Sequence, residues 1–138
     1  MADDASDLLR RVPLFADLAR RDLERVAATM KLRRFNAGDA MVLEGEGGVG
    51  FFVIEEGRAR VSVGEHDVGE VGPGDYFGEI ALMADTDRTA TVRAETDMRC
   101  YGLTRWEFRP IVEANPQVAW KLLEAVAKKV RDAEQRDS

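Results

Sequence analysis

The stretch of sequence from Gly72 to Val92 reads GPGDYFGEIALMADTDRTATV. It lies between a β-like run that ends near Val71 and another that begins near Thr91. Glu79–Met83 consists of good helix formers, and the interval between the two strands has room for one helical turn. The stretch therefore predicts two strands joined through a glycine-rich corner and a single helical turn.

The same stretch has two features that favour an anion-binding site. Gly78 lets a ligand approach the free backbone N–H groups of the helical turn, whose positive end favours an anion by ~0.3–1 kcal/mol. Arg88 has a planar, permanently charged side chain that suits phosphate. It is one of only four basic residues in residues 35–97, which hold fourteen acidic ones. We therefore predict that Arg88 closes one side of an anion pocket.

Short β-like runs separated by glycine-rich breaks extend through residues 32–103. We expect strands at residues 32–35, 40–43, 50–55, 59–63, 67–71, 91–95 and 99–103. The breaks are rich in residues that tolerate turn dihedrals, and several short strands at this spacing favour a sandwich or barrel over a βαβ sheet. Ala37-Gly38-Asp39 and Pro73-Gly74-Asp75 are expected to form equivalent corners in two halves of one roll.

Helical periodicity flanks this β region on both sides. Apolar residues three or four apart over Leu18–Met30 predict an amphipathic helix, and Pro13 ends the short helix before it. Thr104 and Glu107 fit a capping box, which opens a helix that we expect to kink at Pro110. We predict one domain over residues 1–138, with a helical N-terminus (1–31), a β roll (32–103) and C-terminal helices (104–138).

The last helix is expected to begin at Asn115-Pro116 and to run to about Glu134. Its broad apolar stripe consists of Val118, Ala119, Leu122, Leu123, Val126, Ala127 and Val130. A stripe of this kind packs a helix against the rest of a domain. Its width also allows a second use, as the seam of a homodimer.

Composition excludes several classes of protein. With one histidine and one cysteine, the chain has almost nothing from which to build a zinc, iron or copper site. Cys100 has no partner for an intrachain disulfide, so the reducing cytoplasm is the expected compartment. The longest apolar run, residues 49–54, is far shorter than the ~20 residues of a membrane span, and the acidic N-terminus lacks a signal-like pattern. We expect no membrane partner.

The charge pattern and the reactive side chains argue against two further functions. Residues 35–97 carry a net charge of −10 and neither flank has a basic cluster, so direct DNA or RNA binding is not expected. His66 fits a solvated turn and Cys100 a small buried strand residue, because a catalytic thiol needs a base nearby. The sequence has no catalytic constellation, and we expect no enzyme activity.

The run FGEIAL at residues 77–82, followed by RTA at 88–90, resembles the phosphate-binding cassette of cyclic nucleotide-binding domains. We call residues 77–90 the cassette. The likeness continues in the family's order along the chain, with PLF at 13–15, GDAMV at 38–42, GFFVIEEG at 50–57, GPGDYFGE at 72–79 and WEF at 106–108. The chain is thereby identified as a member of this family, which includes the catabolite activator protein, the regulatory subunits of cAMP-dependent protein kinase and cyclic-nucleotide-gated channels.

The resemblance implies a fold and a set of binding residues. The fold is mainly β: an eight-stranded β roll (double-stranded jelly roll) with an N-terminal helix, a short cassette helix and two C-terminal helices. Glu79 would accept a hydrogen bond from the ribose 2′-hydroxyl. Arg88 and the backbone N–H groups of Ile80 and Ala81 would bind the cyclic phosphate. Ligand contacts are also expected from Phe77, Gly78, Leu82, Thr89, Ala90, Val61, Val63, Val71, Leu122 and Val126.

The resemblance also suggests how the base is bound. The three valines would line a wall against the base, and Leu122 or Val126 of the last helix would close over it as a lid. Thr89 admits adenine or guanine, because a hydroxyl at that place can reach the phosphate or the 2-amino group of guanine. No cofactor is expected besides the ligand, cAMP or cGMP.

Two functions fit these features. The first is a non-catalytic sensor that binds cAMP or cGMP, moves its last helix and so signals to a protein effector. The second is a protein-interaction module with the same fold and an empty or degenerate pocket, because Asp85 and Asp87 stand where many relatives have Gly and Pro. Transcription factors of the family place a helix-turn-helix after the last helix. Only thirteen residues follow Ala125, so we expect no operator binding by these residues.

Overall fold

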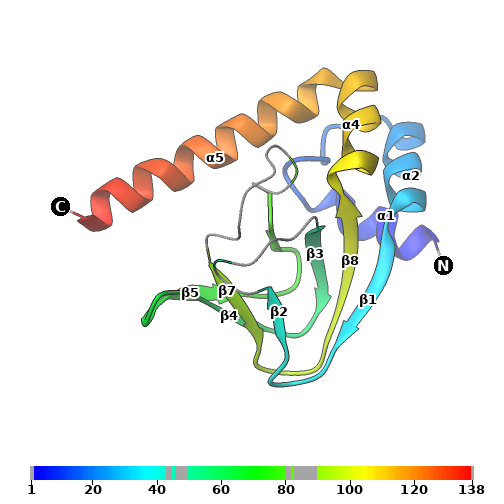
Figure 1. The fold of residues 1–138 in the computed structure, drawn as a ribbon. Coiled ribbons are helices and arrows are strands. Elements are labelled where there is room, and N and C mark those ends of the chain that lie inside the picture. Colours follow the sequence, from blue (N-terminus) through cyan, green and yellow to red (C-terminus); the bar gives the residue numbers. More distant parts are fainter. Residues whose placement is uncertain (1, 43–44, 46–49, 80–81, 83–89, 138) are drawn as a thin grey trace.

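The computed structural model of the chain describes residues 2–42, 45, 50–79, 82 and 90–137. It has two sheets folded into a roll, with helices before and after them (Figure 1). The helices are α1 (Ala2–Arg10), α2 (Arg20–Thr29), α4 (Arg105–Ala114) and α5 (Pro116–Asp137). The strands are β1 (Lys31–Phe35), β2 (Ala40–Val42), β3 (Gly50–Glu56), β4 (Ala59–Val63), β5 (His66–Val71), β6 (Tyr76–Phe77), β7 (Thr91–Ala94) and β8 (Met98–Thr104).

The eight strands of the described residues form two antiparallel sheets, in the orders β1-β8-β3-β6 and β2-β7-β4-β5. This confirms the mainly β, eight-stranded roll. Seven strands coincide with the expected runs to within one residue at each end. The eighth, β6, is too short to show a period in the sequence, and its pairing with Phe52 and Val53 of β3 fixes it instead. The expected short cassette helix falls mainly on residues outside those described.

Strand β3 is buried on both faces, which explains its unbroken apolar sequence. Phe51 and Val53 belong to one buried cluster, on the helical side of the sheet. Phe52 and Ile54 belong to a second cluster, inside the roll between the two sheets. All four side chains are at most 7% exposed. β3 is therefore the layer between the two cores of the protein.

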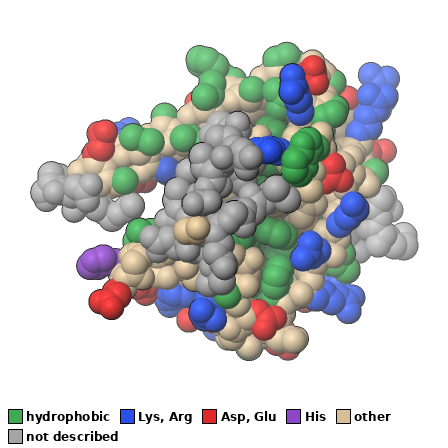
Figure 2. Space-filling model, viewed as in Figure 1, with side chains coloured by type: hydrophobic (Ala, Val, Ile, Leu, Met, Phe, Trp, Pro, Cys, Tyr) green, Lys and Arg blue, Asp and Glu red, His purple; other side chains and the backbone are tan. Residues whose placement is uncertain are grey.

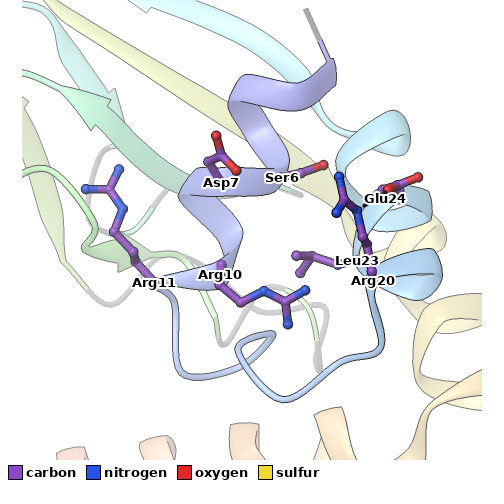
Figure 3. A pocket seen from close by; sticks show the side chains of 7 residues that line it. All are labelled: Ser6, Asp7, Arg10, Arg11, Arg20, Leu23 and Glu24. Carbon is purple, nitrogen blue, oxygen red and sulfur yellow. Dashed lines mark hydrogen bonds and ion pairs between the residues drawn. The ribbon is translucent and has the colours of Figure 1, made fainter.

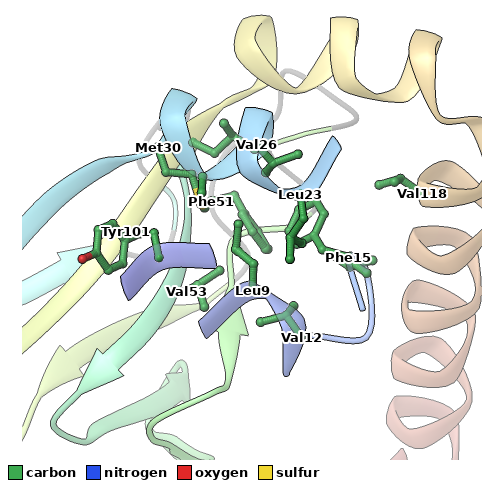
Figure 4. Close-up of a cluster of buried hydrophobic side chains, with 14 of the residues drawn as sticks. Leu9, Val12, Phe15, Leu23, Val26, Met30, Phe51, Val53, Tyr101 and Val118 are labelled. Carbon is green, nitrogen blue, oxygen red and sulfur yellow. The ribbon is translucent and has the colours of Figure 1, made fainter. Parts of the chain in front are cut away.

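The first cluster joins the helices to the outer face of the β1-β8-β3-β6 sheet (Figure 4). Its members include Leu9, Val12, Phe15, Leu23, Val26, Met30, Phe51, Val53, Tyr101 and Val118. Leu82 of the cassette and Leu122 of α5 belong to the same cluster. Full burial of one such side chain stabilises the fold by roughly 1.5–3 kcal/mol. The cassette and α5 therefore share one core.

Two corners of the roll have the same hydrogen bonds, as expected for equivalent turns. In the first, the Asn36 N–H donates to Oδ2 of Asp39 at 2.8 Å. In the second, the Gly72 N–H donates to Oδ2 of Asp75 at 2.8 Å. Each aspartate N–H also donates back, to the Asn36 and Gly72 carbonyl oxygens at 3.0 and 2.9 Å. The aspartate of each Gly-Asp pair thus closes its own turn.

Helix boundaries follow the local signals in the sequence. The Glu107 N–H donates to Oγ1 of Thr104 at 3.2 Å, and the Thr104 N–H donates to Oε1 of Glu107 at 2.9 Å. These two bonds confirm the capping box at the start of α4. Helix α4 continues through Pro110, and α5 begins at Pro116 as expected.

Alanine at Gly57 or Gly74 should separate backbone strain from steric clash. Both glycines have positive φ, 98° and 88°, so a Cβ strains either position by roughly 1–2 kcal/mol. A Cβ at Gly74 has no heavy atom within 4 Å, whereas a Cβ at Gly57 lies 2.5 Å from the Asp97 carbonyl oxygen. We expect Gly57→Ala to lower the free energy of unfolding more than Gly74→Ala in urea denaturation. If both variants lose the same free energy of unfolding, the backbone around Asp97 moves to accommodate the Cβ and the clash does not destabilise the fold.

Candidate functional site

The predicted ligand-binding residues divide into two groups. Ile80, Ala81, Arg88 and Thr89 lie outside the residues that the structure describes. The described part of the cassette comprises Phe77, Gly78, Glu79, Leu82 and Ala90. The structure therefore gives the start of the cassette and the elements that pack against it.

Strand β6 fixes the start of the cassette. Phe77 pairs with Phe52 of β3, and the two rings stack with their centroids 5.3 Å apart. Gly78 follows with a φ of 89°, so the chain turns out of the strand through a conformation that favours glycine. The Leu82 N–H then donates to the Glu79 carbonyl oxygen at 3.1 Å. Glu79 therefore begins a tight turn immediately after a strand anchored in the roll.

The Glu79 carboxylate is buried, and the residue is only 3% exposed. Its Oε1 accepts a hydrogen bond from Nζ of Lys129 in α5, fifty positions further along the chain. Its Oε2 is also buried and has no hydrogen-bond partner among the described residues. A buried acceptor without a partner loses the free energy of its hydration, so such an atom needs an explanation. Glu79 thus has one engaged oxygen and one buried oxygen that lacks a partner among the described residues.

Lys129 also lies near the ring of Tyr76, with Nζ 5.9 Å from the ring centroid. An ammonium at this distance is attracted by the face of an aromatic ring. Burial raises the pKa of Tyr76, and the nearby Glu79 carboxylate raises it further. Tyr76, Glu79 and Lys129 therefore form one charged cluster where β6 meets α5.

Helix α5 brings Lys129 to the cassette because the face of the helix that packs on the core also contains Lys129, beyond the last core residue. Val118 and Leu122 are buried in the first cluster, and Val126 packs against it. Lys129 lies three positions further, on the same face of the helix. Sequence reasoning missed Lys129. The signal that could have found it is the spacing of three or four residues from Val118 through Leu122 and Val126 to Lys129, which places the lysine on the buried face of the helix.

Four of the five predicted wall and lid residues lie in or against the two cores, and Val63 does not. Val61 of β4 and Val71 of β5 are partly buried against the cluster inside the roll, and Val63 of β4 is 40% exposed. Leu122 is buried in the first cluster and Val126 packs against that cluster. The structure therefore brings the two predicted lid residues together with Leu82, and places two of the wall residues against the other core.

Two other basic side chains of the roll have partners of their own. Arg60 forms ion pairs with three carboxylates, Asp67, Glu70 and Glu95, at 3.1, 3.0 and 3.6 Å. These carboxylates, Asp67 most strongly, raise the pKa of Arg60. Arg93 donates to the backbone carbonyl of Gly38 at 3.0 Å. Arg60 is thus paired with carboxylates of the roll, and Arg93 is hydrogen-bonded to the Gly38 turn.

A hollow of about 500 Å³ between α1 and α2 is lined by charged side chains (Figure 3). Its lining residues are Ser6, Asp7, Arg10, Arg11, Arg20, Leu23 and Glu24. Arg10 donates to the carbonyl oxygens of Ala16 and Leu18 at 3.1 and 2.8 Å, and thereby holds the connection between the two helices. None of the predicted ligand-binding residues lines this hollow.

The remaining reactive side chains have structural explanations. Cys100 is fully buried in β8, as expected, and burial raises the pKa of its thiol to about 12, so the thiol stays protonated at neutral pH. His66 is exposed at the start of β5. Within the described ranges, no three His, Cys, Asp or Glu side chains are placed to hold a metal ion. No helix of the described residues has both the length and the apolar character that a membrane crossing requires.

Comparison with known proteins identifies relatives of this chain. A family model described as "Cyclic nucleotide-binding domain" matches residues 32–115. The cAMP-dependent protein kinase regulatory subunit of Mycosarcoma maydis is 41% identical over 90 residues, 62% of this chain. A cGMP-dependent protein kinase of Drosophila melanogaster is 34% identical over 115 residues, 78% of this chain. The chain spans only 17% and 12% of the lengths of these two proteins.

Two solved structures have a similar fold. The catabolite activator protein of Thermus thermophilus gives a TM-score of 0.83 at 24% identity, over 90% of this chain and 61% of that protein's chain. The structure of cAMP-bound PfPKA-R gives a TM-score of 0.83 at 26% identity, over 97% of this chain and 45% of the other. The second likeness extends over almost all of the roll and its flanking helices.

Glu79→Gln should lower the pKa of Tyr76. The substitution removes the negative charge that favours the neutral phenol, while burial remains, so the pKa should stay above its ordinary value. An alkaline absorbance titration measures this in a Tyr101→Phe background, which leaves Tyr76 as the only tyrosine. Glu55→Gln is the control, because Glu55 pairs with Arg99 instead. An identical Tyr76 titration with and without the Glu79 charge would contradict the charged cluster.

Proposed function

This chain belongs to the cyclic nucleotide-binding domain family, and on that premise we propose that it is a non-catalytic sensor of cAMP or cGMP. The ligand binds in the cassette, and the position of the last helix responds. A protein effector then receives the signal. The relatives include a regulatory subunit of cAMP-dependent protein kinase and a cGMP-dependent protein kinase, so both nucleotides are candidates.

The observation that carries this proposal is the buried carboxylate of Glu79. Its Oε2 has no partner among the described residues. A ribose 2′-hydroxyl is a neutral donor of the kind that this oxygen lacks, and it supplies the hydrogen bond without adding charge. Glu79 therefore suits the ribose contact that the resemblance implies.

The other parts of a cyclic nucleotide have matching partners in the sequence. Arg88 provides a cation for the cyclic phosphate, and the N–H groups of Ile80 and Ala81 provide donors. Gly78 lets the ligand approach the backbone closely. The apolar valines of β4 and β5 suit the face of a base, and Thr89 accepts adenine or guanine.

We also propose that α5 forms the seam of a homodimer. Three large apolar side chains on its outer face are highly exposed: Trp120 (66%), Leu123 (53%) and Val130 (54%). They recur at intervals of three and seven residues, the spacing of a coiled-coil seam. Hydrophobic side chains also lie along α5 in Figure 2. An exposed apolar stripe that can pair with itself about a two-fold axis favours a second copy as its partner.

Arg88→Ala should weaken cyclic nucleotide binding by ~30- to 5000-fold, about 2–5 kcal/mol, because the bound phosphate loses its charged partner. Isothermal titration calorimetry with cAMP and with cGMP measures this loss and identifies the preferred nucleotide. Arg58→Ala is the matched control, because Arg58 is an exposed arginine of the same roll outside the cassette. This control should bind as tightly as the wild type.

Two outcomes of this calorimetry contradict the sensor. One is a wild type that binds neither nucleotide, and the other is an Arg88→Ala variant that binds as tightly as the wild type. The first outcome favours the alternative, a protein-interaction module with the same fold and an empty pocket. Native mass spectrometry of protein purified from its source separates the two functions, since it detects a co-purified nucleotide or a stable protein partner.

Leu123→Glu should convert the dimer to a monomer, because it buries a charge in the centre of the apolar seam. Sedimentation velocity measures the mass, which we expect to be twice that of one chain for the wild type. Leu32→Glu is the matched control, since Leu32 is 39% exposed on β1, away from α5. A wild type that sediments as a single chain at high concentration would exclude the seam.

A further inference from the structure

Lys129 connects α5 to the cassette through one carboxylate oxygen. Its Nζ bonds to Oε1 of Glu79 and lies near the Tyr76 ring. The Lys129 side chain is 56% exposed and the Glu79 side chain only 4%, so the lysine reaches from the surface to a buried group. A buried carboxylate is costly unless a cation and hydrogen bonds compensate it. Lys129 is therefore the cation that the fold provides for Glu79 in the described residues.

This pairing determines which oxygen of Glu79 remains for a ligand. The terminal torsion of a glutamate is soft, so an unpaired carboxylate can present either oxygen in many orientations. With Oε1 held by Lys129, Oε2 is the acceptor that lacks a partner among the described residues. We infer that Lys129 is a positioning residue for ribose recognition: it holds Oε1 of Glu79 so that Oε2 receives the ribose 2′-hydroxyl. This assignment rests on the proposed function.

The charges at the site support the same assignment. A cyclic nucleotide brings a negative phosphate to a place that already contains the negative Glu79, inside a segment of net charge −10. Arg88 balances one of these two negative charges. Lys129 balances the other, from a part of the chain outside the acidic segment. With both cations present, the charges of Glu79, the phosphate, Arg88 and Lys129 sum to zero, which low-dielectric surroundings favour.

The position of Lys129 on α5 links ligand affinity to this helix. Val118 and Leu122 hold α5 in the same cluster as Leu82 of the cassette. When α5 leaves, Glu79 loses Lys129 and Oε2 loses its orientation, so nucleotide affinity falls. By thermodynamic linkage, bound nucleotide stabilises the docked helix by the same factor.

Calorimetry with nucleotides that differ only at the 2′ position tests this assignment. The probes are cAMP and 2′-deoxy-cAMP, or cGMP and 2′-deoxy-cGMP where cGMP binds more tightly. Lys129→Ala should weaken binding of the ribose nucleotide by about tenfold, the lower value for one hydrogen bond to a charged group. The deoxy nucleotide should lose clearly less, because it makes no contact with Oε2. The wild-type preference for the 2′-hydroxyl should therefore shrink in the variant.

Two further variants control for charge and for folding. Lys128→Ala removes the same charge from the neighbouring exposed position of α5, and should keep the wild-type affinities and preference. Lys129→Arg keeps a cation and a donor, and should restore most of the preference for the 2′-hydroxyl. Thermal melting of each variant tests whether the fold is intact.

The outcomes separate this assignment from the function on which it rests. If Lys129→Ala weakens both nucleotides equally, or weakens neither, the assignment is wrong and the cyclic nucleotide sensor stands. If the wild type binds neither nucleotide, the proposed function is wrong and the assignment falls with it.

Discussion

The burial of β3 on both faces is the constraint on which the rest of the structure depends. Phe51 and Val53 lie under the helices, and Phe52 and Ile54 fill the roll. Loss of either layer would expose apolar surface at a cost of about 25 cal/mol per Å². The strand therefore needs the second sheet on one side and the helices on the other. β6 pairs with β3 and the cassette starts in β6, so the packing of β3 also sets the position of Glu79.

Helix α5 is held in two physically different ways along its length. Val118 and Leu122 anchor its first half in the apolar core, which also contains Leu82 of the cassette. Beyond Val126, none of its described residues belongs to either buried cluster, and Lys129 makes a polar contact with Glu79 instead. A helix held by a core at one end and by an ion pair further along can move at its far end while the roll stays folded. This division suits a ligand that acts at Glu79.

The roll was predictable because glycine-containing turns separate its strands, and because Gly38-Asp39 and Gly74-Asp75 mark the same corner twice. β6 was not predictable, since two residues have no period and only pairing with β3 defines them. The sequence shows one broad apolar stripe on α5. It does not show which of these side chains are buried, because that depends on the position of the core, which ends near Val126. The charge balance of a segment does not reveal Lys129, because this lysine contacts a residue fifty positions away.

Charge sets the last condition on how the site works. The acidic roll opposes an approaching anion at long range, so on the proposed function a cyclic nucleotide is held by contacts at a few ångströms, where screening by salt is weak. Glu79 alone would repel the phosphate at that range. Paired with Lys129, the carboxylate becomes half of a neutral pair, and it can accept a hydroxyl without opposing the phosphate nearby. On the proposed function, the Glu79–Lys129 ion pair therefore favours the anionic ligand while α5 is docked, and it links recognition of the ribose to the position of the helix.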